Sequence, residues 1–273
     1  MSLNTKIEWS DASWNPCRGC TPVSPGCKNC YARTFAERFR GTPGNAYERG
    51  FDPRLAPDKL LEPLKWTKPQ RVFVNSMSDL FHDEFPDDYI VDCARVMSMA
   101  PHHTFHTLTK RPERMAELLN DQLRFTEQQP HIWWGVTVED REHGVPRIDI
   151  LRKAPAAHRF LSVEPLLGDL GEFDLAGISW VICGGESGRG ARPILRNWVT
   201  SVRDQCEAAK VPFFFKQWGG PRKGMTGRFV MGRIHHEKPS WVQLPDRDPA
   251  EVSTFINEIE AKYELAEHGV TKD

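Results

Sequence analysis

Short apolar runs alternate with amphipathic stretches along most of this chain. The apolar runs are rich in Val, Ile, Phe and Trp and predict strands over residues 71–75, 103–109, 132–138, 159–163, 178–183 and 212–216. Between them, apolar residues recur every three or four positions, which predicts helices over residues 86–99, 112–119, 145–153 and 197–209. Strands that alternate with helices indicate βαβ units and a parallel sheet. We expect an α/β fold that forms a complete or partial parallel (β/α) barrel.

The N-terminal part of the chain is less regular. Residues 7–14 predict one short strand that leads into a cysteine-rich segment. The helical pattern that begins at Cys27 ends at Gly41, where glycine favours termination. Residues 41–63 are rich in Gly, Pro and charge, and we expect one helix around residues 57–66.

The pattern weakens again after Gln217, where glycines and basic residues predict a mobile loop. A final helix is expected over residues 249–265, before a polar tail. No internal repeat and no second core are evident. We therefore expect one barrel domain over residues 1–218, with a loop and helix extension over residues 219–273 packed on the same domain.

The cysteines are concentrated near the N-terminus. Four of the seven lie within one short segment, at Cys17, Cys20, Cys27 and Cys30, among prolines and glycines that favour a tight loop. Four thiolates suit a tetrahedral structural zinc site, whereas three can hold a 4Fe-4S cluster and leave one iron open. Both metals remain possible at this point, and unligated thiols or disulfides are disfavoured in a cytosolic chain.

Charge and hydropathy limit the location and partners of the protein. The 36 Lys and Arg residues nearly balance the 37 Asp and Glu residues, so any nucleic-acid binding must come from a local patch. The N-terminus has no apolar signal core, and no apolar run is long enough to span a bilayer. We expect a cytoplasmic protein that does not bind membranes.

Polar residues follow each of five predicted strands. They form the segments Asn75 to Asp79, Thr107 to Arg111, Thr137 to Asp140, Ser162 to Pro165 and Gly184 to Gly188. Because ligands bind beyond the carboxyl ends of parallel strands, these segments predict one polar active site that faces the cysteine loop. Ser or Asp after a strand also caps helices, so each segment alone is weak evidence.

Several residues of this edge are candidates for catalysis or substrate binding. His82 is a candidate acid or base, although a loop histidine is the simpler interpretation. Glu164 and Glu186 could act as paired carboxylates in a hydrolase, or pair with arginines. Cys183 is expected to be a packing residue, with hydrogen-atom donation as the alternative. The segment from Gly184 to Gly190 lacks the full spacing of a phosphate loop.

These motifs together resemble the radical S-adenosylmethionine (SAM) superfamily. The closer resemblance is to a phage and prophage family with a three-cysteine motif, carried by Trp-Asn-Pro, Cys-x6-Cys-x2-Cys-Tyr-Ala, Asn-Ser-Met-Ser-Asp-Leu-Phe-His, Leu-Thr-Lys-Arg-Pro, Glu-Pro-Leu-Leu-Gly, Gly-Gly-Glu-Ser-Gly and Phe-Phe-Phe-Lys-Gln-Trp-Gly. The resemblance implies a bacterial host and a 4Fe-4S cluster at Cys20, Cys27 and Cys30. Cys17 falls outside the motif, and the first cysteine gap is longer than in most of the superfamily.

The chain is also similar to spore photoproduct lyase and related enzymes, and this similarity implies a SAM site. Asn75, Ser76, Ser78 and Asp79 would hold the SAM amino group, and Lys110 the carboxylate. Thr137 or Glu139 would reach the ribose, and the Tyr31 backbone the adenine. Arg111 replaces a serine of those enzymes, which leaves its role open.

The reaction implied by the resemblance begins when one electron from the cluster cleaves a carbon–sulfur bond of SAM, giving a 5′-deoxyadenosyl radical. An external donor of the flavodoxin or ferredoxin type would supply the electron. The phage resemblance suggests a nucleotide or a modified DNA base as substrate, such as hypermodified thymidine. A basic segment also suggests such a substrate. It contains Arg222, Lys223, Arg228 and Arg233, and Trp218 and Trp241 lie nearby in the sequence. The alternative is a non-enzymatic nucleic-acid-binding protein with a four-cysteine zinc knuckle.

Overall fold

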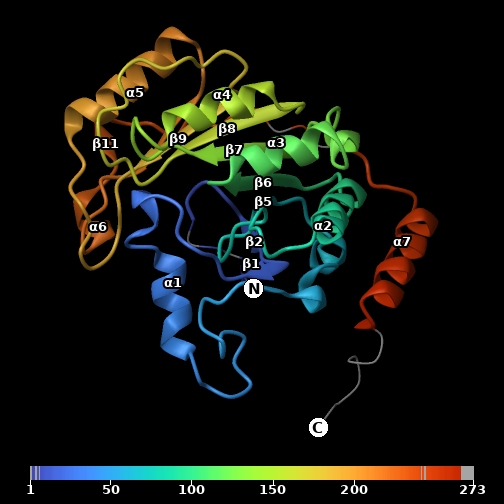
Figure 1. Cartoon of the computed structure of the whole chain (residues 1–273). Helices are drawn as coiled ribbons and strands as arrows, with labels where there is room; N and C mark the ends of the chain where they lie inside the picture. The colour runs from blue at the N-terminus through green and yellow to red at the C-terminus, as the bar shows by residue number, and fades with distance from the viewer. Residues whose placement is uncertain (1, 4, 6, 241, 243, 266–273) are drawn as a thin grey trace.

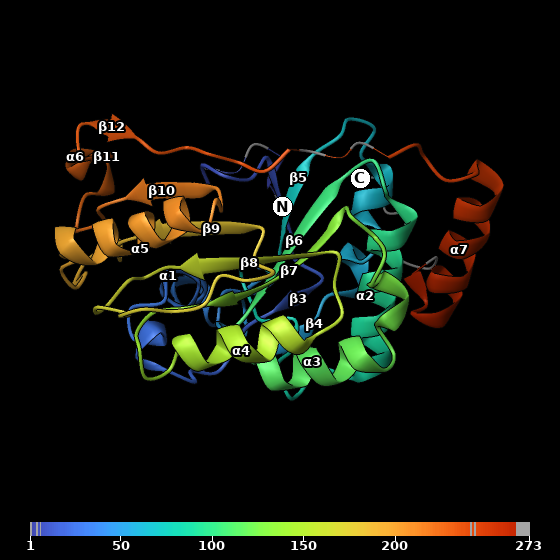
Figure 2. The same ribbon diagram turned by 90° about the horizontal axis from the view of Figure 1, so that it is seen from above.

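The computed structural model describes residues 2, 3, 5, 7–240, 242 and 244–265. Its centre is a sheet of eight strands in the order β1-β2-β5-β6-β7-β8-β9-β10, in which β1 is antiparallel to β2 and the other pairs are parallel. These strands are β1 (Ser2–Leu3), β2 (Ala12–Trp14), β5 (Arg71–Val74), β6 (Thr104–Thr109), β7 (Ile132–Thr137), β8 (His158–Val163), β9 (Trp180–Gly184) and β10 (Phe213–Gln217). The sheet curls into a half-barrel, which confirms the predicted partial barrel (Figures 1 and 2).

Helices cover the outer face of the half-barrel (Figure 2). The covering helices are α2 (Asp87–Met99), α3 (Pro112–Asn120), α4 (Val145–Lys153) and α5 (Arg196–Ala208), and each lies within one or two residues of its predicted range. Each buries one apolar side. In α3, for example, Met115, Leu118 and Leu119 are buried, because residues three and four apart share a helix face.

Alternate strand residues form two separate cores. Val181 and Cys183 of β9 point outward into the core under the helices, whereas Trp180 and Ile182 point into the hollow of the half-barrel. The inner core is mostly aromatic and consists of Trp9, Phe73, Trp133, Phe160, Trp180, Ile182 and Phe214. This cluster fills the interior and forms the floor of any site at the strand ends.

Two predicted elements of the N-terminal part are corrected. The helix expected over residues 57–66 is two short 3-10 turns, η3 (Pro57–Lys59) and η4 (Glu62–Lys65). Pro63 lacks the N–H that a continuous α-helix would need at this point. The strand expected over residues 7–14 is confined to β2, because a turn with a hydrogen bond from Ser10 N to Ile7 O precedes it.

The cysteine segment lies between small elements. It begins at β3 (Cys17–Arg18), which pairs with β4 (Arg54–Leu55), continues through the 3-10 turn η1 (Pro25–Cys27), and enters α1 (Tyr31–Ala36) and η2 (Glu37–Phe39). The predicted helix that ends near Gly41 is therefore confirmed, although its first α-helical residue is Tyr31.

The C-terminal extension packs on the half-barrel. After α6 (Lys223–Thr226) and the hairpin of β11 (Phe229–Val230) and β12 (Arg233–Ile234), the chain ends in α7 (Pro249–Lys262) beside α2. Glu258 of α7 pairs with Arg95 at 2.8 Å, and Lys262 pairs with Asp92 at 2.6 Å. Trp241 of the predicted basic segment lies outside the described residues. None of the described helices has the length and apolar character needed to cross a bilayer.

Candidate functional site

A cavity of about 760 Å³ opens at the carboxyl ends of the strands, between the sheet and the cysteine loop. This volume is within the range of small-molecule and cofactor sites. Thirteen of the sixteen residues predicted from the sequence line it. They are Cys20, Cys27, Cys30, Tyr31, Asn75, Ser76, Ser78, Asp79, Lys110, Arg111, Thr137, Glu164 and Glu186. Residues predicted from separate strand ends and from the cysteine loop therefore line one cavity.

The four cysteines of the loop divide into two groups. Cys20, Cys27 and Cys30 line the cavity, whereas Cys17 is fully buried in the outer core. Among the described residues, no three His, Cys, Asp or Glu side chains converge closely enough to bind a single metal ion. A zinc knuckle would need Cys17 beside the other three. Three separate thiols around an open cavity instead suit a cluster in which each cysteine binds a different iron.

Cys20 lies beside a fixed positive charge. Its Sγ accepts a hydrogen bond of 3.4 Å from Nη1 of Arg111. Burial raises the pKa of the Cys20 thiol to about 11, the Asp79 carboxylate adds to this effect, and Arg111 opposes it. Burial, Asp79 and Arg111 thus act together on this sulfur.

Asn75 is the cavity residue best suited to bind a polar ligand. The residue is 3% exposed and lines the cavity directly after β5. Its backbone has a φ of 61°, a left-handed conformation that asparagine tolerates better than most residues. Both its Nδ2 and its Oδ1 are buried without a hydrogen-bond partner among the described residues. Because such groups are costly to bury, this amide fits a polar ligand in the cavity.

The neighbouring predicted residues are already engaged by the protein. Ser76 Oγ donates to Asn15 Oδ1 at 3.2 Å, and Ser78 Oγ donates to the Cys17 carbonyl at 3.0 Å. Tyr31 Oη donates to the Ser76 carbonyl at 2.6 Å, which joins α1 to the loop after β5. These side chains shape the wall of the cavity.

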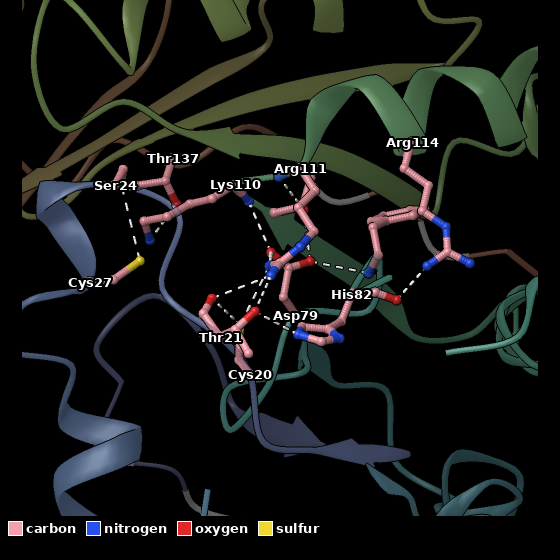
Figure 3. A network of polar contacts seen from close by, with 12 residues as sticks. Cys20, Thr21, Ser24, Cys27, Asp79, His82, Lys110, Arg111, Arg114 and Thr137 are labelled. Atoms are coloured by element: carbon pink, nitrogen blue, oxygen red, sulfur yellow. Dashed lines mark hydrogen bonds and ion pairs between the residues drawn. The ribbon is translucent and has the colours of Figure 1, made fainter. Parts of the chain in front are cut away.

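Asp79 organises the loop after β6 (Figure 3). Its carboxylate accepts hydrogen bonds from Thr109 Oγ1 at 2.7 Å, from Lys110 N at 3.1 Å and from Arg111 Nη1 at 3.2 Å. The Lys110 side chain extends toward β7, where Nζ is 3.4 Å from Thr137 Oγ1. This long contact leaves the ammonium group well placed for an anionic ligand.

The two predicted carboxylates have basic partners. Glu164 pairs with Lys216 at 3.2 Å, and Glu186 pairs with Arg192 at 2.5 Å. Burial alone would raise the pKa of Glu186, but hydrogen bonds from Arg192 and Asn29 outweigh burial and lower this pKa to about 2. Glu186 therefore lacks the raised pKa of a general acid, which argues against the paired-carboxylate hydrolase.

Two glycines at the end of β9, Gly184 and Gly185, allow close packing of neighbouring segments. A Cβ atom on Gly185 would lie 2.2 Å from the Trp218 carbonyl oxygen, and one on Gly184 would lie 2.5 Å from Glu164 Oε1. These close approaches account for Gly184 and Gly185 without a phosphate.

Three predicted residues do not line the cavity. His82 is 2% exposed, and its Nε2 forms a hydrogen bond of 2.8 Å with Thr21 Oγ1. Burial and the charge of Arg111 lower the pKa of His82. Glu139 is fully buried against Arg147 at 2.5 Å and accepts a hydrogen bond from Ser24 Oγ. Cys183 faces the outer core, where burial raises its pKa well above the ordinary value. His82 was considered as an acid or base, Glu139 as a contact to the ribose and Cys183 as a hydrogen-atom donor. Each of these roles needs contact with the cavity.

Some residues that line the cavity or lie beside it escape the sequence analysis. Asn29 and Arg192 connect the cysteine loop to the loop after β9, since Asn29 Nδ2 donates to Glu186 at 2.8 Å and Arg192 Nη1 donates to the Pro25 carbonyl at 3.0 Å. No local pattern reveals such a contact. Lys216 could have been found, because it lies near the end of a strand as the other predicted residues do.

Comparison with solved structures finds several of spore photoproduct lyase. One, a mutant with bound AdoMet and dinucleoside spore photoproduct, has a TM-score of 0.46 and 10% identity, covering 96% of this chain and 76% of that one. Another, the enzyme complexed with dinucleoside spore photoproduct, has a TM-score of 0.41 and 11% identity, covering 90% and 72%. No curated protein sequence matches. A family model described as "Protein of unknown function (DUF5131)" matches residues 4–239, and the chain belongs to that family.

Proposed function

We propose that this protein is a radical SAM enzyme that holds a 4Fe-4S cluster through Cys20, Cys27 and Cys30. The main observation behind the proposal is that the four cysteines of the loop lie in two different places. The three that match the radical SAM motif line one cavity with the unpartnered amide of Asn75, while Cys17 is buried in the core. This arrangement agrees with a three-thiolate site better than with a four-thiolate zinc site.

The polar groups of the cavity would bind SAM. The Asn75 amide can donate to the SAM carboxylate or accept from its amino group, and Lys110 Nζ can pair with the carboxylate. Thr137 lines the cavity and can reach the ribose, whereas Glu139 is occupied by Arg147. The backbone of Tyr31 would meet the adenine. Cluster and SAM together would supply a 5′-deoxyadenosyl radical, with the electron from an external flavodoxin- or ferredoxin-type donor.

The floor of the cavity would keep water from the reaction. Trp9, Phe73 and Leu108 line it from below, and the buried aromatic cluster closes the half-barrel behind them. Apolar walls limit side reactions of an enclosed intermediate. The chain therefore contributes orientation and exclusion of water, and the cofactors contribute the bond cleavage.

The substrate we propose is a nucleotide unit within a nucleic acid. Charge is strongly segregated: residues 17–55 and 186–236 contain 17 of the 36 Lys and Arg residues but only 6 of the 37 Asp and Glu residues. These segments carry α1 on one side and α6 and β11 on the other (Figure 1). They also expose aromatic side chains, with Tyr31 57%, Phe35 43% and Phe229 63% exposed. Basic groups among exposed aromatics are typical of single-stranded nucleic-acid binding.

Replacement of single cysteines by alanine tests the metal assignment. We expect Cys20→Ala, Cys27→Ala and Cys30→Ala each to lose most of the bound iron after anaerobic reconstitution. The matched control, Cys17→Ala, should keep the iron and lower the free energy of unfolding by about 1 kcal/mol through lost core packing. Equal loss of metal in all four variants, with zinc as the metal, would overturn the proposal.

A further inference from the structure

The guanidinium group of Arg111 lies between the cysteine loop and the end of the sheet (Figure 3). Nη1 donates to Cys20 Sγ at 3.4 Å and to Asp79 Oδ2 at 3.2 Å. Nη2 donates to Thr21 Oγ1 at 3.0 Å and to the Thr21 carbonyl at 3.3 Å. The side chain is 8% exposed. A permanent cation is thus held against one of the three cavity cysteines.

These contacts argue against a role for Arg111 as a ligand clamp. The two terminal nitrogens of a guanidinium carry four N–H groups, and the four contacts above engage all of them. Binding of a ligand carboxylate would need to break bonds that join Cys20 and Thr21 to the strand ends. Lys110, with its single long contact, is the better candidate for that task.

The surrounding groups fix the position of Arg111. Asp79 orients Nη1 and is itself held by Thr109 Oγ1, while Thr21 is held by its hydrogen bond with His82. Cys27, by comparison, faces the neutral hydroxyl of Ser24 at 4.0 Å. The contact between Arg111 and Cys20 therefore distinguishes one cysteine of the three and is built into a rigid network.

We infer that Arg111 is a positioning residue that fixes Cys20 and raises the reduction potential of the cluster bound there. The inference rests on the proposed function. Hydrogen bonds to the ligand sulfurs and nearby charge are among the factors that set iron–sulfur potentials. A cationic donor stabilises the reduced cluster more than the oxidised one, because reduction adds negative charge. Arg111 would thus make the cluster easier to reduce.

The test is an EPR-monitored redox titration of the anaerobically reconstituted full-length protein and its variants. For Arg111→Gln we expect a more negative potential, with the ratio of reduced to oxidised cluster about tenfold lower at a fixed potential, which is about 59 mV for one electron. Arg111→Lys should shift the potential in the same direction, because an ammonium group cannot reproduce the fork of contacts. The shift should be smaller, because the positive charge is retained.

Arg114→Gln is the matched control. Arg114 lies one turn further along α3 and donates to the carbonyls of His82 and Phe85, and in the network of Figure 3 it contacts no cysteine. The reduction potential of the cluster in Arg114→Gln should equal that in the unchanged protein. A purely structural role for Arg111 would admit water to the cluster, and water, by stabilising the reduced state, would shift the potential in the positive direction.

The outcomes separate this inference from the proposed function. A potential for Arg111→Gln that is unchanged or more positive, with the iron content retained, overturns the inference. If Arg111→Gln takes up too little iron to titrate, Arg111→Lys decides, and an unchanged potential in that variant overturns the inference as well. If the unchanged protein binds no cluster, the proposed function itself fails.

Discussion

At the scale of single residues, Asn75 connects backbone conformation to ligand binding. Its left-handed φ and its two amide atoms, which have no hydrogen-bond partner among the described residues, both oppose folding, and the residue lines the cavity. Strain and unsatisfied polar groups of this kind concentrate at functional sites. We therefore propose that the Asn75 amide binds the ligand and does not stabilise the fold.

Replacement of Asn75 by glycine separates these two roles. Glycine keeps the positive φ, so we expect the free energy of unfolding of the cluster-free protein to change by less than about 1 kcal/mol in urea denaturation. SAM affinity of the reconstituted protein, measured by calorimetry, should fall about tenfold, since hydrogen bonds to the ligand are lost. Asn120→Ala, at an exposed position of α3, is the control. Unchanged SAM affinity in Asn75→Gly would exclude the assignment.

Residue identities at the site were largely predictable, but their tasks were not. Strand-end position identified Asn75, Asp79 and Lys110, because parallel strands end at one edge. The same rule could not separate Asp79, whose oxygens are occupied by Thr109, Lys110 and Arg111, from Asn75, whose amide is unpartnered. That difference depends on contacts between segments distant in the sequence.

At the scale of elements, two acidic residues help to hold the cysteine loop against the sheet. Asn29 Nδ2 donates to the Glu186 carboxylate, which also accepts from Arg192 in the loop after β9. Ser24 Oγ donates to Glu139, which Arg147 of α4 fixes in place. A loop of prolines and glycines has little regular structure of its own, so these buried acidic partners determine its position.

The Glu186 contact predicts an acid-sensitive connection between loop and sheet. The folded-state pKa of about 2 lies below the ordinary 4.5, so the ionised carboxylate stabilises the folded state above about pH 4.5. This contribution is lost as the pH falls from about 4.5 toward 2. Urea unfolding at pH 7 and pH 3 should therefore show a smaller acid-induced loss of stability in Glu186→Gln than in the unchanged protein.

Glu172→Gln provides the comparison for that experiment. Glu172 is exposed, and its replacement should leave the pH dependence as it is in the unchanged protein. Identical pH profiles for Glu186→Gln and Glu172→Gln would show that the contact between Glu186 and Arg192 does not stabilise the fold.

Element boundaries were predictable where the periodicity was strong. Helices α2 to α5 and strands β5 to β10 follow the apolar pattern closely, since each has one buried face or lies fully buried in a parallel sheet. Prediction failed over residues 57–66, where apolar side chains at helical spacing occur together with Pro57 and Pro63. There proline geometry, and not the apolar pattern, determines the backbone.

At the scale of the whole molecule, the nearly neutral net charge conceals a strong asymmetry. The basic segments 17–55 and 186–236 flank the cavity, and the acidic excess lies in the rest of the chain. Composition could predict only that a local patch was required. Its position depends on how the fold brings two distant segments to the same edge of the sheet.

This asymmetry predicts salt-dependent binding of nucleic acid. A fluorescent single-stranded oligonucleotide should bind the unchanged protein more weakly as salt increases, because bound counterions are released on association. Replacing Arg222 and Arg233 with glutamate should lower the affinity at least tenfold and reduce the salt slope by about 1.4, at roughly 0.7 per contact. Lys153→Glu, on the outer helix α4, should bind like the unchanged protein. Equal weakening by Lys153→Glu would exclude a specific basic surface.

The most direct test of the central claim is the metal content and EPR spectrum of the protein purified without oxygen. The account predicts about four iron and four sulfide per chain, and a signal after dithionite reduction that changes when SAM is added. One tightly bound zinc per chain, without an iron–sulfur signal, would contradict it and would favour a zinc-stabilised binding protein.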